Sequence, residues 1–286
     1  MINTTKTTLP MLAEMRHQGR KIAMVTAYDA PSGRLADAAG VDVVLVGDSA
    51  GTTVLAGTST VPVTMEEMVV YTRGVSRGVP RALVVADMPF GSYQVSEAAA
   101  VENAVRLVKE GGADAVKLEG AGRTLTRISG IIESGIPVMG HIGLTPQSAT
   151  MLGGLKAQGR TAPAARRLVE DAVALERAGC FAIVLEAMPA VVGERVTAAV
   201  KVPTIGIGAG PACSGQVLVW HDLLGLIAGP TPRFVKQYAS LASVITHALE
   251  AYVEDVRSGV FPAAAHEYGM PDAERARFES QPATRK

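Results

Sequence analysis

The sequence has few cysteines, few aromatic residues and no excess of charge of either sign. Its two cysteines in 286 residues, Cys180 and Cys213, form neither a CxxC motif nor a Cys/His cluster, so we expect a reducing compartment and no disulfide framework. Aromatic residues make up 4% of the chain and the formal net charge is zero. Both values argue against a nucleic-acid partner and against binding to an acidic membrane surface.

Long apolar runs are also missing. The N-terminal residues carry no apolar segment behind a basic end, so we expect no signal peptide. The longest stretches without formal charge, residues 134–155 and 202–220, are interrupted by glycine and proline and could not form a membrane-spanning helix. Because 48% of the residues are apolar and 19% are charged, we expect a large core in a soluble, cytoplasmic protein.

The sequence does contain a repeated unit: a short apolar run, a loop with one or two polar residues, and a helical segment that often ends in glycine. Continuous apolar runs are typical of strands that are covered on both faces in a parallel sheet. Such runs occupy residues 22–26, 43–46, 82–86, 115–118, 137–139, 181–185 and 203–207. Helices are predicted to begin at Ser96 and Thr161, and an amphipathic helix is predicted over residues 238–257.

Seven or eight such units in about 250 residues, with no internal linker, predict a (β/α)8 TIM barrel. An open doubly wound sheet is the alternative, but no glycine-rich phosphate turn follows the first strand. The eighth strand is predicted at either residues 224–228 or residues 234–236. We expect residues 8–19 to form an N-terminal capping helix, residues 1–269 to form one catalytic domain, and residues 270–286 to form a polar, mobile tail.

Titratable side chains follow or end six of the apolar runs. In a parallel barrel the carboxyl ends of all strands meet at one mouth, where reactive residues collect. The polar residues at these strand ends are Tyr28, Asp29, Asp48, Ser49, Asp87, Lys117, Glu119, His141 and Glu186. Because the burial of unpaired charges is costly, so many titratable groups at one mouth indicate an active site rather than a scaffold.

Each of these residues also has a purely structural interpretation. Asp48 could hydrogen-bond its own turn, and Asp87 could cap its strand. Lys117 and Glu119 are two positions apart and could be only an ion pair on one face of a strand. His141 is either a core histidine or a residue that contacts the metal ligands without binding the metal itself. The functional interpretation therefore depends on the whole set.

Three of the carboxylates, those of Asp48, Asp87 and Glu119, predict a metal site. Hard oxygen ligands without a nearby cysteine suit Mg²⁺ or Ca²⁺, and a site that keeps waters suits Mg²⁺. Glu186 would then remain for proton transfer, and Lys117 with the Ser49 hydroxyl would bind an anionic substrate. A metal beside a base is suited to the removal of a proton next to a carbonyl group, because the metal stabilises the enolate.

Longer motifs resemble a known family. In chain order, the motifs VGDSAGT, VPVTMEEM, VADMPFGSY, AVKLEG, PVMGHIGLTPQS, GGLKAQGR, IVLEAMP, IGIGAG and SGQVLVWHDLLG closely resemble the ketopantoate hydroxymethyltransferase family, also called 3-methyl-2-oxobutanoate hydroxymethyltransferase. The resemblance runs from Thr8 to Tyr268 and implies a barrel of the phosphoenolpyruvate/pyruvate superfamily. It also implies a homodecamer.

The resemblance implies transfer of the one-carbon unit of 5,10-methylenetetrahydrofolate to 3-methyl-2-oxobutanoate, giving 2-dehydropantoate and tetrahydrofolate in pantothenate biosynthesis. By position, the Mg²⁺ ligands of the family match Asp48, Asp87 and Glu119. The positions that bind the keto acid match Asp48, Ser49, Asp87 and Lys117, and the proton acceptor matches Glu186. Tyr71, where many relatives have histidine, and the C-terminal sequence HEYGM depart from the family pattern and leave folate-side details open.

Two other functions are weighed against this one. A C–C or C–P lyase or mutase acting on another 2-oxo acid would need a reactive cysteine or additional arginines near the mouth, and the sequence shows no such cysteine loop. A catalytically inactive, ring-forming or metabolite-binding protein would lack one of the four carboxylates, and all four are present. Metal-dependent exchange of the C3 proton of 3-methyl-2-oxobutanoate would separate the three.

Overall fold

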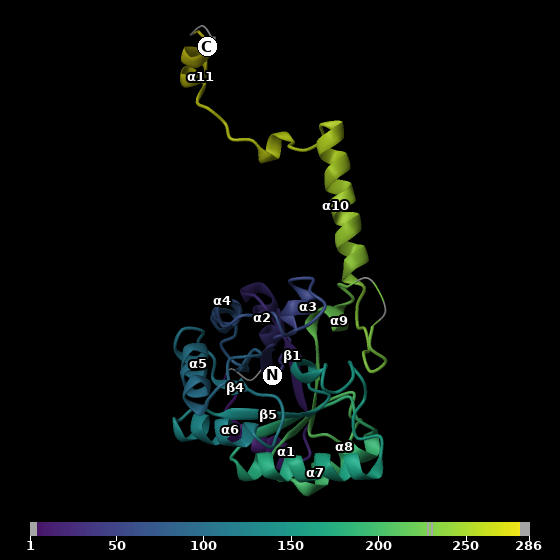
Figure 1. Cartoon of the computed structure of the whole chain (residues 1–286). Coiled ribbons are helices and arrows are strands. Elements are labelled where there is room, and N and C mark those ends of the chain that lie inside the picture. Colours follow the sequence, from purple (N-terminus) through teal and green to yellow (C-terminus); the bar gives the residue numbers. More distant parts are fainter. Residues whose placement is uncertain (1–4, 228, 230, 281–286) are drawn as a thin grey trace. The chain divides into compact units, whose positions relative to one another are not determined.

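The computed structural model describes residues 5–227, 229 and 231–280, and within them eight parallel strands close into a barrel (Figure 1). The strands follow chain order around the barrel: β1 (Ile22–Thr26), β2 (Val43–Val46), β3 (Leu83–Asp87), β4 (Ala115–Lys117), β5 (Val138–Gly143), β6 (Ala182–Glu186), β7 (Thr204–Ile207) and β8 (Gly215–Leu218). The parallel pairing of β8 with β1 sets Leu218 beside Val25 and closes the barrel. The predicted (β/α)8 fold is confirmed.

Alternate side chains of each strand face the barrel interior and its outer surface. The inward-facing apolar side chains form one cluster: Ile22, Met24, Val43, Leu45, Leu83, Val85, Ala115, Met139, Ala182, Val184, Ile205, Ile207 and Val217. Their neighbours along the strands, such as Val44, Val84 and Ile183, pack with the helices in a second cluster. Because both faces are buried, the strands appear in the sequence as continuous apolar runs.

Helices connect the strands on the outside of the barrel. The longer ones are α2 (Ala30–Ala38), α4 (Met65–Gly78), α5 (Glu97–Lys109), α6 (Thr124–Glu133), α7 (Ala162–Arg177) and α8 (Ala190–Ala199), and the shorter ones are α3 (Ala50–Thr53) and η1 (Pro146–Ser148). The short helix α9 (Trp220–Leu224) follows the last strand. The predicted starts of α5 and α7 are confirmed, because the hydroxyls of Ser96 and Thr161 each accept a hydrogen bond from the backbone N–H three residues ahead.

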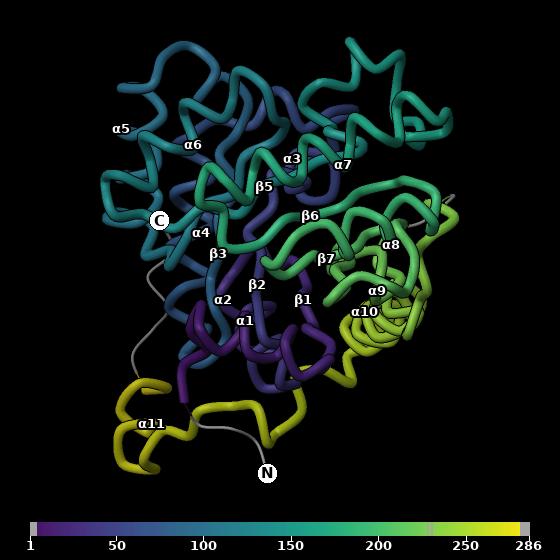
Figure 2. The backbone as a smooth tube through the Cα atoms, turned by 90° about the horizontal axis from the view of Figure 1, so that it is seen from below, coloured from purple at the N-terminus to yellow at the C-terminus, as the bar shows by residue number. Residues whose placement is uncertain are grey.

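Helix α1 (Leu9–His17) covers the lower mouth of the barrel, where the strands begin. Seen from below, it lies in front of the strands (Figure 2). Its buried side chains Leu12 and Met15 belong to the same apolar cluster as the inward-facing strand residues. The expected capping helix is thus present, and it seals the end of the barrel opposite the strand ends predicted to carry the chemistry.

The prediction for the eighth strand is wrong. The strand is β8 (Gly215–Leu218), whereas residue 224 ends helix α9, residues 234–236 form no strand, and residue 228 lies outside the described residues. Two physical features hide this strand in the sequence. It follows β7 without an intervening helix, and it begins with glycine and exposes Gln216, so it shows neither the repeat spacing nor a continuous apolar run.

The chain divides into two compact units after Ala239. The second unit contains α10 (Leu241–Ser258), η2 (Ala264–His266) and α11 (Asp272–Glu279). Helix α10 confirms the predicted C-terminal helix, and α11 gives regular structure to part of the segment expected to be a tail. The predicted limit of the catalytic domain at residue 269 stays a prediction. Across the described residues, no helix has the length and apolar character needed to cross a bilayer.

Candidate active site

Polar side chains form the uppermost layer of the barrel interior. Because side chains alternate along a strand, the residue two positions after an inward-facing apolar residue also faces inward. Four titratable side chains stand in that position at the upper ends of β3 to β6: Asp87, Lys117, His141 and Glu186. The alternation therefore brings four titratable groups from four adjacent strands to one place.

Asp48, Asp87 and Lys117 form a buried charged group in this layer. The backbone N–H of Asp48, just after β2, donates to Asp87 Oδ2 (3.1 Å), and Lys117 Nζ lies 3.0 Å from Asp87 Oδ1. Burial, and then the carboxylates of Asp87 and Glu119, raise the pKa of Asp48 well above its ordinary value. Burial alone would lower the pKa of Lys117, but the surrounding carboxylates raise it. Lys117 is therefore a fixed cation at neutral pH.

His141 connects Glu119 with Glu186. Its Nδ1 lies 3.5 Å from Glu119 Oε1 and 3.2 Å from Lys117 Nζ, and its Nε2 lies 3.2 Å from Glu186 Oε2. Burial and Lys117 would lower the pKa of His141, but its interactions with Glu119 and Glu186 raise it to about 9. The carboxyl of Glu119 is stabilised in its charged form, since His141 lowers its pKa against the effect of burial. His141 thus belongs to the polar site, and it is not an isolated core histidine.

Ser49 is held at the edge of this group by Tyr28. The Tyr28 hydroxyl lies 2.8 Å from Ser49 Oγ and accepts a hydrogen bond from Thr26 Oγ1 (3.0 Å). Asp29, the next residue after Tyr28, serves the fold instead. Its carboxylate accepts from the backbone N–H of Ser32 (2.8 Å) and caps helix α2. The structure therefore brings together the predicted site residues and leaves Asp29 out.

Three buried polar residues of the site were not predicted from the sequence: Thr60, Tyr93 and Gln147. Gln147 Nε2 donates to Asp48 Oδ2 (2.8 Å), and the Tyr93 hydroxyl donates to Gln147 Oε1 (2.6 Å). Thr60 Oγ1 faces the same cavity and has no hydrogen-bond partner among the described residues. The sequence offers only a weak signal for them, because they are neutral and lie beyond the strand ends, Gln147 in the short helix η1 and the other two in loops.

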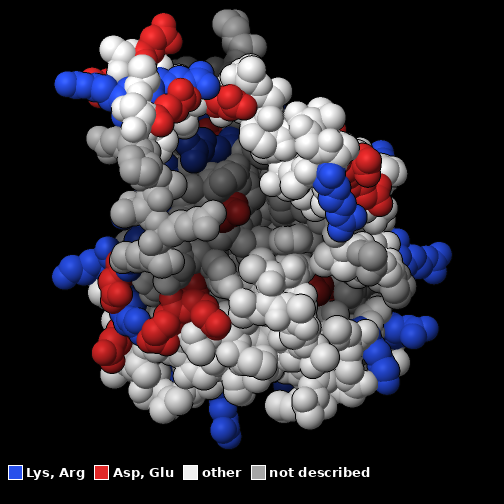
Figure 3. Space-filling view, turned by 90° about the horizontal axis from the view of Figure 1, so that it is seen from above, with Lys and Arg blue, Asp and Glu red and all other residues white. Residues whose placement is uncertain are grey.

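Two adjoining cavities open at the upper mouth. The inner one, about 180 Å³, is lined by the predicted residues Asp48, Ser49, Asp87, Lys117, Glu119, His141 and Glu186. The outer one, about 850 Å³, has mostly uncharged walls that include Leu144, Leu155 and Ala187, with Arg233 among them. Ser49, Glu186 and Phe234 line both cavities, so the two meet. Figure 3 shows a hollow with acidic atoms deep inside it.

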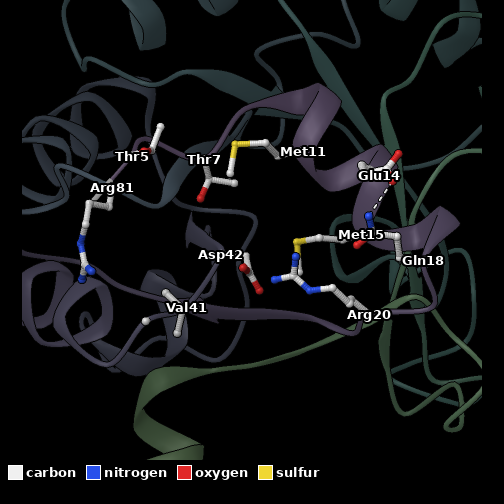
Figure 4. Close-up of a pocket in the computed structure, with 11 residues that line it drawn as sticks. Thr5, Thr7, Met11, Glu14, Met15, Gln18, Arg20, Val41, Asp42 and Arg81 are labelled. Atoms are coloured by element: carbon white, nitrogen blue, oxygen red, sulfur yellow. Dashed lines mark hydrogen bonds between the residues drawn. The ribbon is translucent and has the colours of Figure 1, made fainter. Parts of the chain in front are cut away.

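A separate cavity of about 420 Å³ lies at the lower end of the barrel beside α1 (Figure 4). Gln18 Nε2 donates to Glu14 Oε1 (2.7 Å) at its wall, and the side chain of Arg20 points toward Asp42. Of the described residues that line it, none belongs to the predicted site. The residues predicted to carry the chemistry therefore lie at the upper mouth and not in this cavity.

The carboxylates of Asp48, Asp87 and Glu119 fit a divalent cation in charge and in ligand chemistry. Asp87 Oδ1 is buried and, within the described part of the chain, accepts no hydrogen bond at a suitable angle. In that same part, no three or more His, Cys, Asp or Glu side chains are gathered closely enough to hold a metal ion. The Mg²⁺ site expected from the sequence therefore stays a prediction.

Comparison with known proteins identifies the family. A sequence profile described as Ketopantoate hydroxymethyltransferase matches residues 6–264. The chain belongs to the ketopantoate hydroxymethyltransferase family. A 3-methyl-2-oxobutanoate hydroxymethyltransferase of Moorella thermoacetica is 57% identical over 268 residues, which cover 94% of this chain and 100% of that protein. One from Heliobacterium modesticaldum is 53% identical and covers 93% of this chain and 97% of its own length. The resemblance seen in the motifs is confirmed. Because the family consists of hydroxymethyltransferases, the protein is an enzyme.

Solved structures share the fold of this ketopantoate hydroxymethyltransferase family member at much lower identity. A phosphonopyruvate hydrolase superposes with a TM-score of 0.59 at 13% identity and covers 96% of this chain and 95% of that one. A 2,3-dimethylmalate lyase, a member of the PEP mutase/isocitrate lyase superfamily, gives 0.57 at 15% identity and covers 96% and 99%. At this identity the similarity supports the barrel fold alone.

Proposed function

We propose that this enzyme transfers the one-carbon unit of 5,10-methylenetetrahydrofolate to C3 of 3-methyl-2-oxobutanoate, giving 2-dehydropantoate and tetrahydrofolate for pantothenate biosynthesis. The observation that carries the proposal is the position of Glu186. This carboxylate does not belong to the acidic group formed by Asp48 and Asp87, but it lines the same inner cavity of about 180 Å³ as they do. Family membership supports the choice of reaction.

The inner cavity suits the keto acid, because it is small and contains a fixed cation. Lys117 and the Ser49 hydroxyl would bind the substrate's carboxylate and keto oxygens. Asp48, Asp87 and Glu119 would hold Mg²⁺ at the same place. When bound, this ion would stabilise the negative charge that develops on the keto oxygen as C3 loses its proton.

Glu186 would take the C3 proton, directly or through one water. Its Oε2 lies 3.2 Å from His141 Nε2, close enough for an ion pair when the imidazole is protonated. One C–N bond of the folate methylene opens to an iminium, and its nitrogen takes up a proton. The electron pair left at C3 then forms the new C–C bond to this carbon. Water replaces the second folate nitrogen, giving its OH to the carbon and its proton to the nitrogen, and tetrahydrofolate leaves.

The outer cavity suits the folate donor. Its volume of about 850 Å³ is in the range of cavities that bind drug-sized ligands, about 300–1,000 Å³. It meets the inner cavity at Ser49 and Glu186, which is where the methylene carbon has to reach C3 of the keto acid. Arg233 in its wall would be available for a carboxylate of the donor.

The test is an NMR assay of the purified enzyme with 3-methyl-2-oxobutanoate and 5,10-methylenetetrahydrofolate, with and without a chelator. We expect 2-dehydropantoate only when both substrates and a divalent cation are present. Absence of product under all conditions would overturn the proposed reaction. Undiminished product in excess chelator would overturn the metal assignment alone.

A lyase or mutase that uses a cysteine fits this site less well. Both thiols are buried, and burial raises the pKa of Cys180 to about 12 and also raises that of Cys213. A buried thiol with a raised pKa is a poor nucleophile. The alternative on another 2-oxo acid therefore rests on the shared fold and has no support from a thiol at the mouth.

We also propose that several copies of this chain assemble into a homodecamer, as the family resemblance implies. In the second unit, apolar side chains of α10 are exposed, among them Val244, Leu249 and Tyr252. In the first unit, an apolar groove of about 620 Å³ lies outside β1 and β8, beside Leu35 and Leu223. Exposed apolar surfaces of this kind are typical of protein contacts. Light scattering coupled to gel filtration would measure the assembly directly.

A further inference from the structure

Gln147 contacts two of the three carboxylates proposed to hold the metal. It lies in η1, the short helix after β5, and its residue is 6% exposed. Its backbone N–H donates to Glu119 Oε2 (3.0 Å). Its side-chain Nε2 donates to Asp48 Oδ2 (2.8 Å) and to the backbone oxygen of Met88 (2.9 Å). One residue therefore joins carboxylates that follow two different strands, β2 and β4.

The amide of Gln147 has a single orientation. The Met88 carbonyl oxygen can only accept, so the amide nitrogen must face it, and both of its N–H groups are then used. The amide oxygen accepts from the Tyr93 hydroxyl (2.6 Å) and from Gln94 Nε2 (3.3 Å). All hydrogen-bonding positions of the side chain are therefore occupied, which leaves it no freedom to turn.

Tyr93 connects this amide back to the second carboxylate. Its hydroxyl gives its proton to Gln147 and accepts from the backbone N–H of Glu119 (3.3 Å). The ring is buried, and burial together with the nearby carboxylates keeps the hydroxyl protonated by raising its pKa. Tyr93 and Gln147 thus hold both the backbone and the side chain of Glu119.

We propose that Gln147 is a positioning residue that, oriented by Tyr93, holds Asp48 and Glu119 in the arrangement that binds a divalent cation. This inference rests on the metal site of the proposed function. Gln147 donates two hydrogen bonds to carboxylates of the acidic group, those of Asp48 and Glu119, and adds no charge. Groups that orient metal ligands in this way typically change metal affinity by about 10–100-fold when they are removed.

The test uses Mn²⁺ as the probe, with the free ion measured by electron paramagnetic resonance and no substrate added. Gln147→Met keeps the side-chain length and the backbone bond to Glu119 but removes the amide. We expect it to weaken Mn²⁺ binding about 10–100-fold. Gln18→Met, at an exposed position just after α1, is the matched control and should bind Mn²⁺ as the wild type does.

Thermal unfolding of each variant in chelator separates loss of fold from loss of affinity. If Gln147→Met does not fold, Tyr93→Phe takes its place. It removes only the hydroxyl that orients the amide, and it should show a smaller but measurable loss of affinity. A folded Gln147→Met, or Tyr93→Phe in its place, with wild-type Mn²⁺ affinity overturns the inference and leaves the proposed function standing. A wild-type enzyme that makes product without binding Mn²⁺ or Mg²⁺ overturns both this inference and the metal assignment.

Discussion

At the lower end of the barrel, carboxylates accept hydrogen bonds from the backbone of neighbouring strands, whereas at the upper end they lie beside one another. Asp42 directly precedes β2 and accepts from the backbone N–H of Ala23 in β1 (2.8 Å). Asp114 directly precedes β4 and accepts from Val84 in β3 (2.8 Å). Asp37 Oδ1 accepts from two backbone N–H groups just before β3, at 2.7 and 2.9 Å. Each lower carboxylate therefore fastens adjacent segments together.

At the upper end, the carboxylate of Asp48 has the opposite energetic effect. Asp48, Asp87 and Glu119 come from three neighbouring strand ends into one buried layer, and repulsion from the other two helps to raise the pKa of Asp48. Such a group is costly to the isolated fold and is retained where function needs it. The difference predicts that substitutions at the lower end change stability, whereas those at the upper end change activity.

The largest expected effect is on catalysis, from Glu186→Gln. A general base typically contributes about 10²–10⁴-fold, so turnover should fall by that amount. The melting temperature should stay near that of the wild type, because this side chain is partly exposed at the mouth. Steady-state kinetics and thermal unfolding check both parts. Turnover within tenfold of wild type would remove Glu186 from its assigned role.

Asp37→Asn should give the largest loss of stability among the lower carboxylates. It breaks the ion pair with Arg81 (2.9 Å) and weakens the bonds to two backbone N–H groups, at a cost of about 1–3 kcal/mol. Urea unfolding measures this loss. Activity per folded molecule should not change. A variant of normal stability but low activity would contradict the claim that carboxylates at the lower end act on stability alone.

The same carboxylate predicts a pH dependence. Burial would raise the pKa of Asp37, but hydrogen bonds from Ala82 and Arg81 lower it below its ordinary value of 3.8. A carboxyl whose pKa is lower in the folded state stabilises the fold above its unfolded pKa and loses that effect as the pH falls through the folded value. The difference in unfolding free energy between wild type and Asp37→Asn should thus be constant from neutral pH to about pH 4 and shrink below that.

Asp48→Asn should act with the opposite sign on stability. The pKa of Asp48 is raised in the folded state, so its ionisation destabilises the fold progressively as the pH rises above 3.8. Asparagine keeps an oxygen for the bond from Gln147 and removes the charge. In chelator at pH 7 we expect the variant to be more stable than the wild type and to lose activity. If Asp48→Asn is less stable than the wild type, the claim that the buried carboxylates at the upper end are costly to the fold is wrong.

Asp42→Asn should have the smallest effect. Its bond to the Ala23 N–H is exposed to solvent, so water can replace it, and burial raises the pKa of Asp42, which offsets that bond. The unfolding free energy should stay within about 0.5 kcal/mol of the wild type, and the product assay should show unchanged kinetics. A large kinetic effect here would show that the lower end takes part in the reaction.

The sequence predicts those parts of the fold and site that depend on strand alternation. Asp87 and Glu186 end apolar strands and face inward for that reason, so their convergence follows from the barrel prediction itself. Strand β8 could not be found in this way, because it lacks both a preceding helix and a continuous apolar run. Gln147 and Tyr93 could not be found either, because their partners lie far away in the chain. Gln147 is 99 residues from Asp48 and 54 residues from Tyr93.

Exchange of the C3 proton tests the central claim most directly. Wild-type enzyme with Mg²⁺ and 3-methyl-2-oxobutanoate in D₂O, without folate, should replace the C3 hydrogen by deuterium, as followed by proton NMR. Glu186→Gln should slow this exchange by about 10²–10⁴-fold. A wild-type enzyme that makes product but exchanges no C3 hydrogen without folate, or a Glu186→Gln variant that exchanges it at the wild-type rate, would contradict the account.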